Sequence, residues 1–234
     1  MIFEKVKNLL FPPRCAICDD VILPNQLLCK ECAGKIHPIG GETCRKCGKS
    51  LRDSFGLYCY DCSRKIHYYD RGFAVFEYGD IKLSLYRFKY AGRAEYARFY
   101  AHTANRLLGD VLGEIKPDAL IPVPIHKSRQ RDRGYNQAEV FAKELSVLTN
   151  IPVISNYIIR HKATIPLKKL DEEGRRNNLK KAFIIGPNGV KLDTIVIIDD
   201  IYTTGATIDE ISRLCREVGV RKIYFLTVAV GKGL

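Results

Sequence analysis

VIIDDIYTTGAT, the stretch from Val196 to Thr207, joins an apolar run to two adjacent carboxylates and a small, hydroxyl-rich turn. The apolar run, TIVIID from Thr194, has the length and β-branched composition of a buried strand. TIDEISRLCREVG, from Thr207 to Gly219, has the apolar spacing of a helix. A buried strand that leads directly into a helix is typical of a parallel sheet covered by helices, so this stretch predicts an α/β fold.

The same alternation extends over the rest of the C-terminal part. A helical pattern runs from Ile81 to Leu112 and is interrupted by KYAGR, residues 89–93. We then expect strands at 118–125, 152–159, 194–199 and 222–230, and helices at 136–148 and 207–219. This order predicts a mainly parallel sheet with helices on both faces. In such sheets ligands bind beyond the carboxyl ends of the strands, where the turns after Pro124 and Ile198 are expected.

Asp199 and Asp200 stand at this predicted edge, directly before the turn. Two ionised carboxylates so close together repel each other unless water, cations or hydroxyl donors surround them, which indicates a ligand rich in hydroxyl groups, usually with a metal nearby. Free amides at a helix N-terminus and threonine hydroxyls favour an anion, and Gly205 allows close approach of the backbone. A sugar phosphate fits both halves. The candidate residues are Asp199, Asp200, Thr203, Thr204, Gly205 and Thr207.

Eight of the nine cysteines lie in the first 62 residues as four CxxC pairs, which are Cys15 and Cys18, Cys29 and Cys32, Cys44 and Cys47, Cys59 and Cys62. A two-residue spacer directs both sulfurs at one ion, and Zn²⁺ takes four such ligands in a tetrahedron. The pattern therefore predicts two structural zinc sites. Consecutive pairing, first with second and third with fourth, is preferred, and an interleaved arrangement stays open on spacing alone.

The zinc interpretation is favoured over disulfides, which need an oxidising compartment that no sequence signal supports. The cysteine-rich segment is too short to form a sufficient hydrophobic core. Metal binding is therefore expected to supply its folding free energy. We place a zinc-ribbon module at residues 1–70 and the α/β domain at 71–234. His67, Tyr68 and Tyr69 either stack on a base or, as we prefer, pack the ribbon against the α/β domain. Cys215, in an apolar helical pattern, is expected to be a buried structural thiol.

The net charge of +12 lies mainly in the C-terminal part. Up to Asp70 there are 11 Lys and Arg against 8 Asp and Glu, and after it 27 against 18. Eight thiolates and two zinc ions would bring the N-terminal segment to about −1. A polyanionic partner and an ordinary solvated basic surface both remain open.

No apolar run approaches the roughly 18 residues of a membrane span, and the N-terminus lacks a signal-peptide cleavage site, so we expect a soluble, cytoplasmic protein. One face of the first helical stretch, formed by Ile2, Phe3, Val6, Leu9 and Leu10, either packs or contacts a membrane surface or a partner.

The acidic stretch is similar to the PRPP-binding motif of type I phosphoribosyltransferases, where PRPP is 5-phosphoribosyl 1-diphosphate. Together with PVPIHKSRQRDRGYNQAEVFA (122–142), RHKATIPLKKLDEEGRRNNLKKAF (160–183) and the four CxxC pairs, the chain resembles the ComF family of bacterial competence-related proteins. The resemblance covers essentially the whole chain. It implies a type I phosphoribosyltransferase-like α/β domain joined to an N-terminal double zinc ribbon.

The resemblance also implies roles for individual residues. Asp199 and Asp200 would hold the ribose hydroxyls, and the turn of Thr203, Thr204, Gly205 and Thr207 would hold the 5′-phosphate. Mg²⁺ would bridge diphosphate and ribose oxygens. The loop 126–136 would bind the diphosphate through Arg131, Arg133 and amides near Gly134, and residues 160–178 would form a hood that contains Arg175 and Asn178.

The implied activity is phosphoribosyl transfer to an unknown acceptor with release of pyrophosphate, in the setting of DNA uptake and natural transformation. The sequence does not identify a residue that would act as the general base. The alternatives are a non-catalytic factor that binds single-stranded DNA and a zinc-ribbon adaptor for competence or DNA-processing proteins. In both, the PRPP pocket would be a sensor or a relic.

Overall fold

The computed structural model describes residues 11–51, 56–161, 182–187 and 190–231. The predictions for Arg175 and Asn178, for most of the hood and for the apolar face at residues 2–10 lie outside this part. None of the helices in the described ranges is both long and apolar enough to cross a bilayer.

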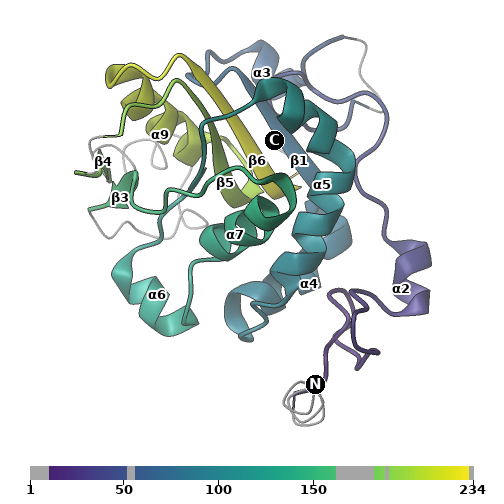
Figure 1. Ribbon diagram of the computed structural model, residues 1–234. Coiled ribbons are helices and arrows are strands. Elements are labelled where there is room, and N and C mark those ends of the chain that lie inside the picture. Colours follow the sequence, from purple (N-terminus) through teal and green to yellow (C-terminus); the bar gives the residue numbers. More distant parts are fainter. Residues whose placement is uncertain (1–10, 52–55, 162–181, 188–189, 232–234) are drawn as a thin grey trace.

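A parallel sheet forms the centre of the described structure (Figure 1). Its strands lie in the order β1 (Arg71–Glu77), β6 (Lys222–Val230), β5 (Thr194–Tyr202) and β2 (Ala119–Pro122), and every neighbouring pair is parallel. β3 (Ile158–Arg160) and β4 (Phe183–Ile185) form a separate antiparallel pair. The predicted α/β class with a mainly parallel sheet is confirmed.

Helices cover both faces of this sheet, as predicted (Figure 1). On one face α4 (Tyr78–Tyr90), α5 (Tyr96–Ile115) and α7 (Gln137–Thr149) pack against Val196 and Ile198. On the other face α9 (Ala206–Glu217) packs against Ile195 and Ile197. Side chains alternate along a strand, so one fully apolar run supplies both cores. The short helices α2 (Lys30–Lys35), α3 (Tyr60–Ser63) and α6 (Lys127–Arg133) lie outside these layers.

The predicted strand at 152–159 is largely wrong. Val153 forms a single bridge to Leu120 of β2, and the chain then turns at Ser155 and Asn156. Serine and asparagine favour turns because their side chains hydrogen-bond to nearby backbone. The remaining apolar residues join the separate β3–β4 pair instead of the central sheet.

The N-terminal ribbon wraps around the edge of the sheet at β1. Ile39 donates its backbone N–H to Val75 O, and Gly72 donates to Lys46 O, both at 2.8 Å. These bonds cover an edge strand that would otherwise be open to pairing. Gly48 passes so close that a Cβ there would lie 2.9 Å from the Ala74 nitrogen, so this approach requires glycine.

Candidate functional site

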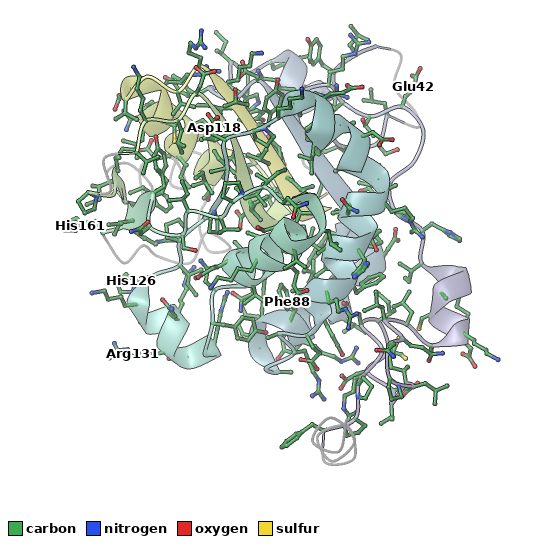
Figure 2. The ribbon with its side chains drawn as sticks, viewed as in Figure 1. Glu42, Phe88, Asp118, His126, Arg131 and His161 are labelled. Atoms are coloured by element: carbon green, nitrogen blue, oxygen red, sulfur yellow. The ribbon has the colours of Figure 1, made fainter. Side chains whose placement is uncertain are left out.

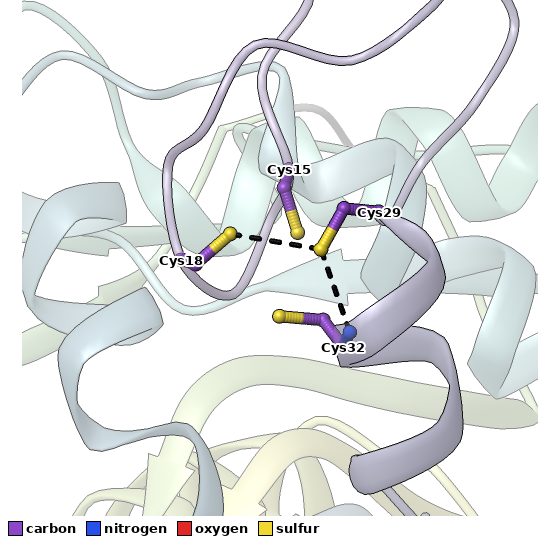
Figure 3. A group of neighbouring side chains, drawn as sticks. All are labelled: Cys15, Cys18, Cys29 and Cys32. Carbon is purple, nitrogen blue, oxygen red and sulfur yellow. Dashed lines mark hydrogen bonds between the residues drawn. The ribbon is translucent and has the colours of Figure 1, made fainter.

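The eight N-terminal cysteines form two groups, each with its sulfurs within 4.8 Å of one another. The members are Cys15, Cys18, Cys29 and Cys32 in the first site (Figure 3) and Cys44, Cys47, Cys59 and Cys62 in the second. The consecutive pairing is confirmed. The Cys18 and Cys29 sulfurs lie 3.8 Å apart, and those of Cys47 and Cys59 lie 3.6 Å apart. Four thiolates around Zn²⁺ at about 2.3 Å would be about 3.8 Å from each other, so both groups fit structural zinc.

Asp19 attaches the first site to the connection between α4 and α5 and to the first residue of α5. Arg93 donates to both carboxylate oxygens of Asp19, at 2.8 and 2.9 Å, and the Tyr96 hydroxyl donates to the same group. Burial opposes ionisation of Asp19, but the hydrogen bonds from Arg93 and Tyr96 outweigh it and lower the pKa of this carboxyl. Only Cys15 of the four ligands is buried.

The second site lies deeper in the protein, and all four of its cysteines are buried. The segment that follows it runs to the α9 face. The His67 ring contacts the Asp209 carboxylate on α9 at 2.7 Å, and the Tyr69 hydroxyl bonds the Tyr202 hydroxyl at the end of β5, at 2.8 Å. The packing interpretation is therefore confirmed for His67 and Tyr69, whereas Tyr68 is exposed.

Asp199 and Asp200 lie at the carboxyl end of β5, as predicted, but the strand continues through Tyr202. Their side chains therefore point to opposite faces of the sheet. Asp200 Oδ2 forms an ion pair with Lys89 Nζ on α4 at 2.8 Å, and Asp199 Oδ1 accepts the Asp200 backbone N–H at 2.8 Å. Both carboxylates are partly open to solvent, which a ligand site requires.

The electric field at this strand end is set by two acids and several cations. Burial, and then the neighbouring charge of Asp200, raises the pKa of Asp199 to about 7, while Lys89 and Arg160 oppose the shift. Burial and the nearby charge of Arg129 lower the pKa of Arg160, on β3, to about 10. Cations from α4, α6 and β3 thus converge on the acidic strand end.

The turn after β5 leads directly into α9. Gly205 takes φ +79° as the N-cap residue, and a Cβ there would lie 2.5 Å from the Tyr202 hydroxyl oxygen, so only glycine fits. A hollow of about 20 Å³ lies at this turn, large enough for one water-sized oxygen. Its lining includes Asp199, Thr203, Thr204, Gly205, Ala206 and Thr207. The predicted phosphate residues therefore meet around one hollow at a helix N-terminus.

The predicted diphosphate loop is a helix instead, because Lys127–Arg133 forms α6 with His126 as its N-cap. Gly134 ends this helix in the left-handed conformation, and its N–H donates to Gln130 O, so the amide that we expected to be free is already bonded. Arg131 is exposed on the outer side of α6 (Figure 2). Arg133 turns away to Gln137 and Tyr90.

Sequence reasoning missed Lys89, Arg160 and Tyr202. Lys89 opens the KYAGR motif, which we interpreted only as a helix interruption. Arg160 comes from the segment assigned to the hood, and its place beside Asp199 depends on the β3–β4 pair, which no local pattern indicated. Tyr202 lies within the acidic stretch itself, but its partner Tyr69 is more than a hundred residues away.

Comparison with known proteins agrees with this architecture. Residues 6–63 match the family model of the double zinc ribbon domain. Competence protein F of Haemophilus influenzae is 32% identical over 215 residues, which cover 83% of this chain and 93% of that protein. The DNA utilization protein YhgH of Escherichia coli O157:H7 is 32% identical over 187 residues, 77% of this chain and 80% of that protein.

Among solved structures, a purine phosphoribosyltransferase from Pyrococcus horikoshii Ot3 aligns with a TM-score of 0.36 at 19% identity, over 56% of this chain and 73% of that one. A likeness of that size does not bear on function. The match to competence protein F runs through both the ribbon and the α/β domain, and the chain therefore belongs to the ComF family.

Proposed function

We propose that this chain binds PRPP at the carboxyl end of β5. The observation that carries this proposal is the direct succession of two carboxylates, a glycine-capped turn and the N-terminus of α9, with Asp199 and the turn lining one hollow. Such a site offers acceptors to sugar hydroxyls and, a few residues later, free amides and hydroxyls to a phosphate. PRPP carries both groups on one ribose.

The two halves of the site take different parts of this ligand. The acids at positions 199 and 200 accept hydrogen bonds from the ribose hydroxyls, and the amides and hydroxyls of Thr203, Thr204 and Thr207 donate to the 5′-phosphate. Asp199 and Asp200 are hard oxygen donors, so they fit Mg²⁺, which keeps several waters and would add positive charge beside the diphosphate. Binding of Mg²⁺ at Asp200 would compete with Lys89, its present partner.

Cations of the chain itself support the diphosphate. Arg160 and Arg129 lie close enough to each other to lower the pKa of Arg160, and an arrangement of like charges is stabilised by an anion between them. We therefore place the diphosphate beside Arg129 and Arg160. Arg133 is occupied by Gln137 and Tyr90 and is a weaker candidate than the sequence suggested.

Beyond binding PRPP, we propose that the chain transfers its phosphoribosyl group to an acceptor. An acceptor nitrogen would donate its lone pair to ribose C1 while the C1–O bond to the diphosphate breaks and its electrons leave on pyrophosphate. Arg129 and Arg160 would stabilise the charge that develops on the leaving group. The names of the relatives, competence protein F and DNA utilization protein, support a role for this binding in the uptake or use of DNA.

Calorimetric titration with PRPP, with and without Mg²⁺, tests the site. The Asp199→Asn, Asp200→Asn double variant is expected to lose binding while it keeps its thermal unfolding transition. Asp110→Asn with Glu114→Gln removes the same charge from the exposed side of α5 and should bind as the wild type does. Unchanged affinity in the first variant refutes the assignment. If the protein binds PRPP but releases no pyrophosphate from it with any nucleobase or amine as the acceptor, a sensor is favoured over an enzyme.

A further inference from the structure

A pocket of about 300 Å³ adjoins the acidic strand end on the α4 side of the sheet. Its walls include Lys82, Leu83, Tyr86, Lys89 and Tyr90 from α4, and also Thr203. Thr203 comes from the turn of residues 203–207, which we propose to bind phosphate and call the phosphate turn. The volume lies at the lower end of the range of small-molecule sites, about 300 to 1,000 Å³. The pocket therefore has the size for a small, compact ligand.

Two tyrosine rings give this pocket an aromatic wall. Tyr86 and Tyr90 are one helical turn apart, their ring centroids lie 5.2 Å from each other, and they are 60% and 55% exposed. Tyr69, Tyr96 and Tyr100, by contrast, are fully buried. Tyr86 presents its ring to a ligand, and Tyr90 presents the face that Arg133 does not cover; flat aromatic ligands stack on such faces.

Tyr90 is held in place before any ligand arrives. The Arg133 guanidinium lies 4.9 Å from the centre of the Tyr90 ring, and its Nη2 donates to the Tyr90 hydroxyl at 3.2 Å. Arg133 in turn donates to Gln137, a buried side chain at the start of α7. This chain of contacts fixes the ring from the core outward, so little ordering entropy is lost when a ligand stacks on it.

The charges around the pocket select the kind of aromatic ligand. Lys82 is exposed at the rim and forms no ion pair with any residue in the described part of the chain. Lys89 lines the pocket and also forms the ion pair with Asp200. Thr203 lines both this pocket and the small hollow at the phosphate turn, which we call the phosphate hollow. A ligand that fits has a planar ring system for the tyrosines and an anionic group for the lysine at the rim.

We propose that the pocket on α4 is a nucleobase subsite, in which a base stacks on Tyr86 and Tyr90 and the attached phosphate contacts Lys82. The same chemistry is offered by a free nucleotide and by one nucleotide of single-stranded DNA. The subsite does not require PRPP. If PRPP binds as proposed above, Thr203 and Lys89 place the base beside the sugar site.

The test uses 2-aminopurine, a base whose fluorescence is quenched by stacking. The chain contains no tryptophan, which leaves the probe signal clear. One arm titrates the protein with 2-aminopurine nucleoside monophosphate, and the other with a single-stranded decanucleotide that carries one 2-aminopurine. Quenching in either arm is expected, and the arm with the higher affinity identifies the source of the base. If the fluorescence is quenched in neither arm, the proposal is overturned.

Substitutions then locate the site. Tyr86→Leu and Tyr90→Leu should each weaken probe binding about tenfold, since one base–aromatic stack contributes roughly this factor. Tyr86→Phe keeps the ring and should bind as the wild type does. Tyr60→Leu is the matched control, because Tyr60 is an exposed tyrosine under an arginine, Arg64 at 4.4 Å, in the zinc ribbon.

The outcomes separate this subsite from PRPP binding. The proposal is overturned if Tyr60→Leu and Tyr86→Leu lose the same amount of affinity for the probe. It is also overturned if neither Tyr86→Leu nor Tyr90→Leu loses any. PRPP titration of the Tyr86→Leu protein should give the wild-type affinity, because Tyr86 does not line the phosphate hollow. A protein that binds the probe through Tyr86 but does not bind PRPP would retain the nucleobase subsite and refute the proposed function alone.

Discussion

The two faces of the sheet each carry a four-cysteine site, but they hold it differently. On the α4–α5 face the first site is attached by polar contacts of Asp19 with Arg93 and Tyr96, and most of its ligands are partly exposed. On the α9 face the second site is fully buried within the same apolar cluster as Tyr69 and Phe225. The first site is attached to the surface of the α/β domain, whereas the second belongs to its core.

This difference extends to the ligand site. The chain leaving the second site places Tyr69 against Tyr202, and Tyr202 supports Gly205 in the phosphate turn. Among the described residues, the first site has no comparable hydrogen-bonded route to that turn. We infer that the second zinc site positions the phosphate turn, whereas the first only stabilises the fold.

Loss of one ligand from each site is the strongest way to break this comparison. Cys47→Ser is expected to destabilise the protein by more than ~3 kcal/mol, because a buried structural zinc site contributes its binding energy to folding. Cys18→Ser should cost less, since Cys18 is half-exposed in the first site. Elemental analysis should give one zinc fewer in each variant, and thermal unfolding reports the difference in stability.

PRPP titration of the same variants sharpens the result. Cys18→Ser should keep the wild-type affinity, whereas any Cys47→Ser protein that remains folded should bind more weakly. Equal affinity in both variants would show that the second site does not position the phosphate turn.

Much of this arrangement could be predicted from local sequence, and the remainder could not. The CxxC spacing predicted both metal sites, and VIIDDIYTTGAT predicted the strand, the acids and the helix N-terminus, because each signal lies within a few consecutive residues. The ion pair between Lys89 and Asp200, and the bond between Tyr69 and Tyr202, depend on how distant segments pack. The helix at Lys127–Arg133 was missed because a run of charged residues lacks the apolar period that marks an amphipathic helix.

The two acids extend the comparison, because they lie on opposite faces of β5. Asp199 has a pKa of about 7 in the folded protein, above its ordinary value, so it binds a proton that the unfolded chain has released. Stability is therefore expected to fall as pH rises from about 4 to about 7. At pH 8 Asp199→Asn should be more stable than the wild type by up to ~4 kcal/mol, the free energy that corresponds to about three pKa units, and at pH 4 the two should match.

Chemical denaturation across this pH range measures the effect. PRPP affinity should rise over the same window, since the ionised carboxylate is the better acceptor for ribose hydroxyls. Asp200→Asn removes the neighbouring charge that raises the pKa of Asp199, so it should move the window to lower pH. A stability difference between Asp199→Asn and the wild type that does not vary with pH would contradict this account.

Tyr69→Phe tests the link between the second site and the phosphate turn with a single oxygen. The change leaves the buried Tyr202 hydroxyl without its partner at 2.8 Å, and an unsatisfied buried hydroxyl costs about 1 to 2 kcal/mol. PRPP affinity should fall with stability, because Tyr202 supports Gly205. Tyr135→Phe is the matched control, because it removes a hydroxyl that donates to Phe88 O on the other face, and it should leave the affinity unchanged.

Asp19→Asn should have the smallest effect, because it loosens only the fastening of the first site. Asparagine keeps one oxygen as an acceptor for Arg93 but replaces the other with an NH2 donor, so the ion pair and one hydrogen bond are lost. The group is partly exposed to water, so we expect a loss of about 1 kcal/mol. The folded-state pKa of Asp19 is lowered, so this contribution is present at neutral pH and disappears as acid protonates the carboxyl. Denaturation at pH 7 and at low pH measures both, and PRPP affinity at pH 7 should not change. A loss of affinity as large as that of Tyr69→Phe would show that both faces of the sheet, and not the α9 face alone, position the phosphate turn.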